Sequence, residues 1–155
     1  MPEDVIDAIL EKTSALSENP IWITQPDRAT LQPFIDQLAD KPPGSLPLWG
    51  IPFAVKDNID VAGMPTTAAC PAFAYTPTTS AFAVEQLVAA GAVPIGKTNL
   101  DQFATGLVGV RSPYGVPFNP STPTLIPGGS SSGSAIAMAC GLSLIHISEP
   151  TRQHH

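Results

Sequence analysis

The sequence predicts an α/β protein with a parallel pair of strands. Two short apolar runs, at residues 51–55 and 92–96, have the length of buried strands, and the segment between them has the apolar spacing of a helix. Strand, helix and strand in this order predict a right-handed crossover. Lys56 and Lys97 directly follow the two runs, so both amines are expected at the same edge of the sheet, where α/β proteins place their chemistry.

Two helices are expected ahead of the first strand. Apolar residues recur at helical spacing over residues 3–17 and again over about 28–39. The dipeptide Asn19-Pro20 ends the first of these helices, and residues 21–24 have the composition of a short extended piece. The N-terminal part of the chain is therefore predicted to be a mainly helical layer.

A proline-rich connector, KPPGSLPLWGIP, separates this layer from the core. Its four prolines and two glycines favour an ordered loop over a helix or a strand. We therefore divide the chain into an N-terminal helical segment, residues 1–47, and a core that begins at residue 48.

Capping residues and prolines predict the bounds of the central helix and of the elements after it. Ser80 has the side chain of an N-cap for the central helix, and Gly91 suits the C′ position at its end. A short helical segment is expected within residues 98–107, followed by a loop with five prolines over residues 108–127. The last predicted helix covers about residues 132–141.

Composition and charge exclude several classes of protein. The 155 residues are 43% hydrophobic and 13% charged, which is typical of a globular domain and not of a disordered chain. The net charge is −6 and no basic patch occurs, so nucleic acid is not an expected partner. No apolar run has the length of a membrane span, and the acidic start, MPEDVIDAIL, lacks the basic region of a signal peptide. A cytoplasmic protein that does not enter a membrane is therefore expected.

The placement of cysteine and histidine narrows the chemistry. Cys70 and Cys140 match no metal or redox spacing, so we expect two reduced thiols in the core and no metal site. All three histidines lie in the last ten residues, which removes a Ser-His-Asp triad from the body of the chain. If a serine acts as a nucleophile here, its base must be another residue, and lysine is the main candidate.

One segment matches a nucleotide-binding pattern by its letters alone. Residues 91–98, GAVPIGKT, fit G-x-x-x-x-G-K-T. A phosphate-binding loop of this kind follows a strand and opens a helix. Here a predicted helix precedes the segment, and the four residues between its glycines build a strand. We interpret Gly91 as a helix cap and Lys97 as a structural residue at a strand end.

A serine-rich stretch, PGGSSSGSA at residues 127–135, precedes the last predicted helix. As a flexible linker it would join two domains, but a short apolar helix follows it. As an anion-binding loop it would use the N-terminus of that helix. As a catalytic loop it needs a base, and burial of Lys56 among apolar side chains would lower the pKa of its amine enough to supply one. On these residues alone, Ser130 could instead cap the helix and Lys56 could pair with Asp57.

Three segments, in this order, resemble the amidase signature family of serine hydrolases: GIPFAVKDNIDVAG, GAVPIGKTNLDQFATG and PGGSSSGSA. The resemblance covers about residues 48–141. It implies an α/β fold with a mixed sheet wrapped by helices, of which this chain holds the N-terminal part. It also implies a catalytic system made of a lysine, a serine in a cis peptide bond and a second serine as the nucleophile. The lysine would be Lys56 and the cis-serine would be Ser130.

The resemblance also implies supporting roles. Gly129 and Ser131 flank the cis-serine, and Ser131 would be a hydrogen-bonding residue. The backbone at Thr105 and Gly106 would line the pocket for the acyl group. No metal and no cofactor are implied, the expected partner is a small-molecule amide, and a homodimer of the full-length protein is compatible with the family.

Within the family, the N-terminal IWIT and the segments TTAACPAFAYTP and NLDQFATGLVGVRSPYGVP are most similar to the allophanate hydrolases. This similarity implies hydrolysis of allophanate to ammonia and carbon dioxide, a step of urea degradation. The alternatives are another amidase of the family or the glutaminase-type subunit of a tRNA amidotransferase. A different class, a non-catalytic binding or decoy chain, also stays open.

The tail, LSLIHISEPTRQHH, departs from the family pattern. Relatives carry the nucleophilic serine in a glycine-rich segment after the cis-serine, whereas at that distance past Ser130 this chain has His154. We therefore separate a core, residues 48–142, from a non-native tail, residues 143–155. We expect the chain to be truncated before its nucleophile and to be inactive as written, and we do not expect Ser148 to replace that nucleophile.

Overall fold

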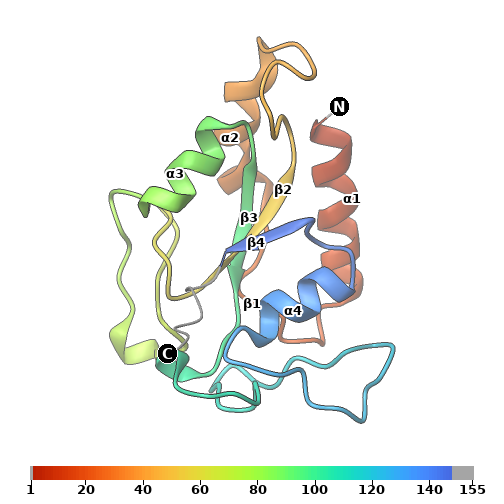
Figure 1. The fold of residues 1–155 in the computed structure, drawn as a ribbon, viewed down its shortest axis with the longest axis vertical. Coiled ribbons are helices and arrows are strands. Elements are labelled where there is room, and N and C mark those ends of the chain that lie inside the picture. Colours follow the sequence, from red (N-terminus) through yellow and green to blue (C-terminus); the bar gives the residue numbers. More distant parts are fainter. Residues whose placement is uncertain (1, 148–155) are drawn as a thin grey trace, which may run out of the picture.

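A four-stranded mixed sheet forms the centre of the computed structural model, which describes residues 2–147 (Figure 1). The strands are β1 (Trp22–Thr24), β2 (Pro52–Lys56), β3 (Val93–Thr98) and β4 (Ile145–Ile147), in the spatial order β1-β3-β2-β4. Strand β2 lies parallel to both β3 and β4, and β1 pairs with β3 in the antiparallel sense. The predicted α/β class and the parallel pair are confirmed.

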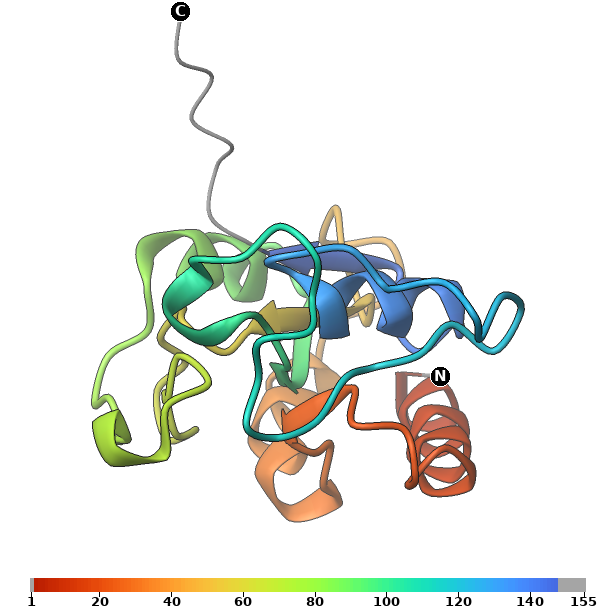
Figure 2. The same cartoon turned by 90° about the horizontal axis from the view of Figure 1, so that it is seen from below.

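Helices lie on both sides of this sheet. They are α1 (Pro2–Ala15), α2 (Arg28–Ala39), α3 (Phe82–Ala89) and α4 (Ser132–Ala139), with short 3₁₀ helices η1 (Pro71–Phe73) and η2 (Gln102–Ala104). In both views α3 lies on one side of the sheet, and α1 and α4 lie on the other (Figures 1 and 2). Among the described residues, no helix combines the length and the apolar character that crossing a membrane requires.

The two central strands are buried along their whole length, as expected of parallel strands covered on both faces. Pro94 breaks the regular pairing because proline has no N–H to donate to the ladder. Phe53 pairs with Pro94 but Ala54 pairs with Gly96, so the register shifts by one residue at this point. A side chain at Gly96 would come within 2.8 Å of the carbonyl oxygen of Thr24, which shows how closely β1 approaches β3.

Side-chain amides tie the N-terminal layer to the core. The amide nitrogen of Asn19 donates to the carbonyl of Phe118 at 2.8 Å, and the backbone N–H of Phe118 donates back to the amide oxygen at 3.1 Å. Asn99, which follows β3, donates its side-chain amide to the carbonyl of Pro20 at 2.9 Å. These bonds fix the position of the chain that leads into β1.

The structure corrects two details of the helix predictions. Ser80 is not the N-cap of α3, because Ala81 holds that position and the hydroxyl of Ser80 accepts from the backbone N–H of Ala62 at 2.9 Å. The short helical segment within residues 98–107 is only the three-residue η2, in which Phe103 has a positive φ of 51°. Gly91 does lie just after the end of α3, with a φ of +96° that favours glycine.

The sequence predicts no regular element after residue 142, but the structure contains β4 there. Ala54 donates its N–H to the hydroxyl of Ser143 at 3.0 Å, and that hydroxyl donates to the carbonyl of Ile145. The strand then pairs with β2, with His146 opposite Ala54. Ser148 and His154 lie outside the described residues.

Candidate functional site

Lys56 and Ser130 meet at the carboxyl end of β2. Lys56 is the last residue of this strand and is fully buried, and its Nζ donates to the hydroxyl of Ser130 at 2.6 Å. The two residues are 74 positions apart in the sequence. The structure therefore brings together the lysine and the serine that the sequence singled out.

The serine loop directly precedes helix α4, and the position of α4 places this loop at the carboxyl end of β2. Thr98, the residue opposite Lys56 in the sheet, shares a hydrogen bond of 2.6 Å with the hydroxyl of Ser134 in the first turn of α4. A side chain at Gly133 would clash with the carbonyl oxygen of Ile21, so glycine allows α4 to lie against the core. The start of the helix is thereby fixed beside the end of β2.

The loop before α4 has an unusual backbone. The peptide bond between Gly129 and Ser130 is cis, and Gly128 has a φ of +77°. Ser131 holds the N-cap position of α4 without a side-chain capping bond, and its carbonyl accepts from Ala135 at 3.0 Å. The hydroxyl of Ser132 is buried and has no hydrogen-bond partner.

Thr105 and Gly106 lie in the loop after η2. The hydroxyl of Thr105 is exposed and donates to the carbonyl of Gln102 at 2.8 Å. Gly106 is buried, and a side chain there would clash with the carboxylate of Asp101. Gly106 therefore packs beside a buried acid, whereas the side chain of Thr105 bonds within its own turn.

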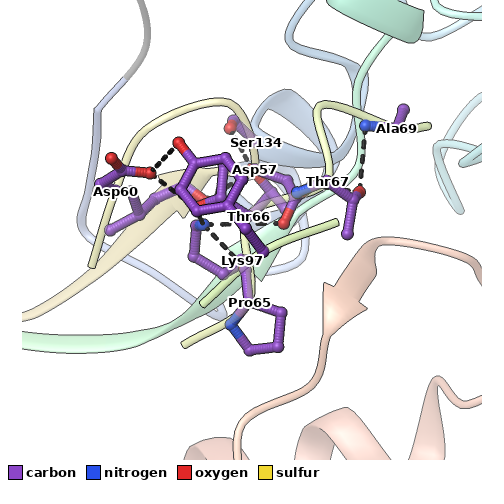
Figure 3. Close-up of polar contacts among 11 residues, drawn as sticks. Asp57, Asp60, Pro65, Thr66, Thr67, Ala69, Lys97 and Ser134 are labelled. Atoms are coloured by element: carbon purple, nitrogen blue, oxygen red, sulfur yellow. Dashed lines mark hydrogen bonds and ion pairs between the residues drawn. The ribbon is translucent and has the colours of Figure 1, made fainter. Parts of the chain in front are cut away.

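Lys97 lies on the opposite face of the sheet from Lys56, because Lys97 pairs with Val55 and neighbouring residues of a strand alternate in direction. Its Nζ donates to the carbonyl of Pro65 and to the hydroxyl of Thr66, both at 3.0 Å, and lies 3.6 Å from a carboxylate oxygen of Asp57 (Figure 3). The interpretation of GAVPIGKT as a helix cap and a strand is confirmed.

Burial lowers the pKa of the Lys97 amine below its usual value, and the negative charge of Asp57 opposes this shift. The other carboxylate oxygen of Asp57 accepts from the N–H of Thr67 at 2.9 Å and from its hydroxyl at 2.5 Å. Asp57 and Lys97 thus form a buried pair that holds the loop after β2. The possibility that Asp57 is instead the partner of Lys56 finds no support in these bonds, since its carboxylate faces Lys97.

Sequence reasoning missed several buried polar residues just past β3. Asn99 is fully buried, and its side-chain oxygen accepts from Leu100 N at 2.8 Å and from the hydroxyl of Ser112 at 2.5 Å. Asp101 is also fully buried and accepts two backbone N–H bonds. The signal was available, because both residues lie just past the carboxyl end of a buried parallel strand, at the sheet edge where Lys56 also lies.

The described residues contain no cluster of three or more His, Cys, Asp or Glu side chains that could hold a metal ion. Cys70 and Cys140 are free thiols, and both are half-buried instead of lying in the core. Two cavities of about 470 and 460 Å³ lie beside α1, and neither is lined by Lys56 or Ser130. The chemistry that the arrangement permits is proton transfer between an amine and a hydroxyl.

The comparisons with known proteins agree on one family. The family model described as Amidase matches residues 21–149. A urea amidolyase from Lachancea kluyveri is 48% identical over 152 residues, which are 93% of this chain and 8% of that protein. A glutamyl-tRNA(Gln) amidotransferase subunit from Akkermansia muciniphila is 46% identical over 108 residues, which are 69% of this chain and 23% of that protein.

A solved structure of Kluyveromyces lactis allophanate hydrolase superposes on this chain with a TM-score of 0.82. The two are 45% identical, and the match covers 92% of this chain and 24% of the other. The chain therefore spans less than a quarter of the length of each of these relatives, and about 8% of the length of the Lachancea kluyveri urea amidolyase.

Proposed function

Since this chain belongs to the amidase family, we propose that Lys56 and Ser130 are the proton-transfer residues of an amide-hydrolysing site. The observation that carries the proposal is the 2.6 Å bond between Lys56 Nζ and Ser130 Oγ at the carboxyl end of a buried parallel strand. General acid–base catalysis requires the exchanging groups to lie within hydrogen-bond reach, and these two do.

In the proposed reaction a serine nucleophile attacks the carbonyl carbon of the amide. The nucleophile passes its hydroxyl proton to Ser130 Oγ while Ser130 passes its own proton to a neutral Lys56 amine. The carbon–nitrogen bond then breaks, and the proton returns from Lys56 through Ser130 to the departing nitrogen. Water then attacks the acyl-serine, and its proton passes through Ser130 to Lys56. The proton returns through Ser130 to the oxygen of the nucleophilic serine as the ester bond breaks and the acid is released.

We propose that the nucleophile is not among the described residues. At the distance past Ser130 where the family carries it, this sequence has His154, which lies outside them. Residues 48–142 would form the part of the site described above, with residues 1–47 as an N-terminal helical segment and residues 143–155 as a non-native tail. In this proposal the 155-residue chain releases no ammonia from an amide when it is alone.

Allophanate is the proposed substrate. The similarity to the Lachancea kluyveri urea amidolyase covers 93% of the chain, whereas the similarity to the amidotransferase protein covers 69%. The matched allophanate hydrolase structure likewise covers 92%. The alternative substrate is the side-chain amide of glutamine, which the resemblance to the glutaminase-type amidotransferase subunits implies. A cytoplasmic location, a homodimer of the full-length protein and the non-catalytic decoy alternative stay predictions.

A chimera tests the proposal directly. The part of this chain that superposes on Kluyveromyces lactis allophanate hydrolase would replace the matching quarter of that enzyme, which then supplies the remaining residues. We expect release of ammonia from allophanate and not from glutamine, and a loss of activity of roughly 10²- to 10⁴-fold in Lys56→Ala and in Ser130→Ala. Lys12→Ala, on α1, is the control and should keep the activity.

Full activity in the Lys56→Ala chimera would disprove the role of Lys56. Ammonia release from glutamine but not from allophanate would replace the proposed substrate with the alternative. Hydrolysis by the 155-residue chain alone would show that its nucleophile lies within the present sequence.

A further inference from the structure

The carboxylate of Asp101 is buried and is satisfied by backbone groups. Its Oδ2 accepts from the N–H of Gly109 at 2.9 Å and its Oδ1 accepts from the N–H of Arg111 at 2.8 Å. The side chain is fully buried, and among the described residues no cation forms an ion pair with it. A buried carboxylate is tolerated when hydrogen bonds of this kind compensate for the water it has lost.

This carboxylate does not have the role that its position suggests. Asp101 holds the N-cap position of η2, where aspartate commonly accepts from the first turn of the helix that follows, but it makes no side-chain capping bond. It accepts instead from the loop eight to ten residues further along the chain. The acid therefore organises the loop over residues 106–111 and not the short helix.

Two glycines pack directly on the same carboxylate. A side chain at Gly106 or at Gly129 would clash with Oδ2 of Asp101. Gly129 is the residue before Ser130, so the carboxylate limits how far the serine loop can move toward β3. The packing also explains why these two positions have no side chain.

Backbone bonds then connect Asp101 to Ser130. The N–H of Asp101 donates to the carbonyl of Ser130 at 2.9 Å, and the N–H of Gly129 donates to the carbonyl of Leu107 at 3.0 Å. The loop that Asp101 organises thus holds one side of the cis peptide bond, and Asp101 itself holds the other. The hydroxyl of Ser130, which follows this peptide bond, lies 2.6 Å from Lys56 Nζ.

We propose that Asp101 is a positioning residue, whose carboxylate sets the distance between the Ser130 hydroxyl and the Lys56 amine. This inference rests on the proposed function of those two residues, and Asp101 itself does not touch the reacting atoms. Asp101→Asn keeps the size of the side chain but replaces one acceptor oxygen by an NH₂ group, which cannot accept from a backbone N–H.

The test follows the Lys56 amine by NMR in the 155-residue chain labelled with ¹³C at the ε carbon of lysine. The sequence has four lysines, so four signals are expected, and Lys56→Arg assigns the relevant one. The Ser130→Ala variant measures how far the pH midpoint of the Lys56 signal moves when the hydroxyl is absent. We expect Asp101→Asn to move this midpoint in the same direction by at least half as much.

Asp27→Asn is the matched control. Asp27 also accepts two backbone N–H bonds, from Ala29 at 3.0 Å and Thr30 at 3.1 Å, but it caps α2, away from the site. It should leave the Lys56 midpoint where it is in the wild type. Asp101→Asn should also shift the amide signals of Gly109 and Arg111, whose bonds it disturbs, and a purely structural role would change these signals alone.

If the pH midpoint of the Lys56 signal is unchanged in Asp101→Asn but shifted in Ser130→Ala, this inference is overturned and the proposed function stays intact. If neither variant moves the midpoint, the amine does not sense the hydroxyl, and both proposals fail. If Asp101→Asn does not fold, Gly106→Ala takes its place, because the added methyl group displaces the carboxylate without removing it. A wild-type midpoint in Gly106→Ala would then overturn the inference.

Discussion

Lys56 and Lys97 are both fully buried and lie at the carboxyl ends of neighbouring parallel strands, but they face opposite sides of the sheet. Lys97 donates to a carbonyl and a hydroxyl and lies beside the carboxylate of Asp57. Lys56 donates to the hydroxyl of Ser130, which lies in the loop before α4 and is 74 positions away in the sequence. The partners of the two buried lysines, and not their burial, therefore separate the structural role of Lys97 from the proton-transfer role that we propose for Lys56.

The expectation that functional side chains lie at the carboxyl ends of parallel strands applies equally to both lysines, so it does not distinguish them. Burial lowers the pKa of the Lys97 amine, yet Lys97 is not the lysine that meets Ser130, so a lowered pKa does not by itself identify the proposed base. The carboxylate of Asp57 gives Lys97 a charged partner, and the loop after β2 depends on that pair. The same substitution made at Lys56 and at Lys97 should therefore have different effects.

The largest difference is expected for replacement by arginine in the chimeric hydrolase. Arginine keeps the positive charge but does not deprotonate in proteins, so it cannot act as the base. Lys56→Arg should lower kcat by roughly 10²- to 10⁴-fold, while Lys97→Arg should change kcat by less than about tenfold because it can still pair with Asp57. Steady-state ammonia release measures both. Equal losses in the two variants would remove the distinction between the lysines.

The second difference concerns stability. Lys97→Met removes one partner of a buried ion pair and leaves Asp57 without a compensating charge, which costs about 3–5 kcal/mol. Urea unfolding of the 155-residue chain measures this loss. The double variant Asp57→Asn with Lys97→Met should recover part of it, since no charge is then left unpaired. A loss below about 0.5 kcal/mol in Lys97→Met would show that the pair is not structural.

A smaller effect is expected at the contact that fixes α4 beside Lys56. Ser134→Ala removes the hydroxyl that shares a 2.6 Å bond with Thr98 in the buried interface between α4 and β3. We expect a loss of about 1–3 kcal/mol in the free energy of unfolding, because the Thr98 hydroxyl loses its short bond. Ser121→Ala, in the exposed loop before α4, is the control and should be neutral. Equal stability of the two variants would count against this anchor.

The smallest effect is a dependence of stability on pH. The pKa of Lys97 is lower in the folded chain than its usual value of 10.5, so the unfolded chain binds more protons between these two values. Stability should therefore rise with pH in that window through Lys97. The pKa of Cys140 is raised by burial, which works in the opposite direction above pH 9. Subtracting the pH profile of Lys97→Met from that of the wild type isolates the lysine, and a difference that falls with pH would contradict the assignment.

The positions of the main elements could be predicted from the sequence because the forces that set them are local. The apolar runs at residues 51–55 and 92–96 became β2 and β3, and the helical spacing over residues 28–39 became α2. Gly91 was found from its conformational freedom alone. Ser80 was misplaced because its hydroxyl serves Ala62 in a neighbouring loop, a partner that capping patterns do not describe.

The sequence by itself determined the α/β class, the sheet edge where Lys56 and Lys97 emerge, and the serine loop before α4, since each depends on residues close together in the chain. Only the tertiary structure shows the bond by which Lys56 meets Ser130, how Asp101 holds the serine loop, and that β4 pairs with β2. The Lys56–Ser130 contact joins residues 74 positions apart, and no local pattern of apolar or polar residues specifies such a partner. They depend on the faces that the sheet and its helices present to one another once they are packed.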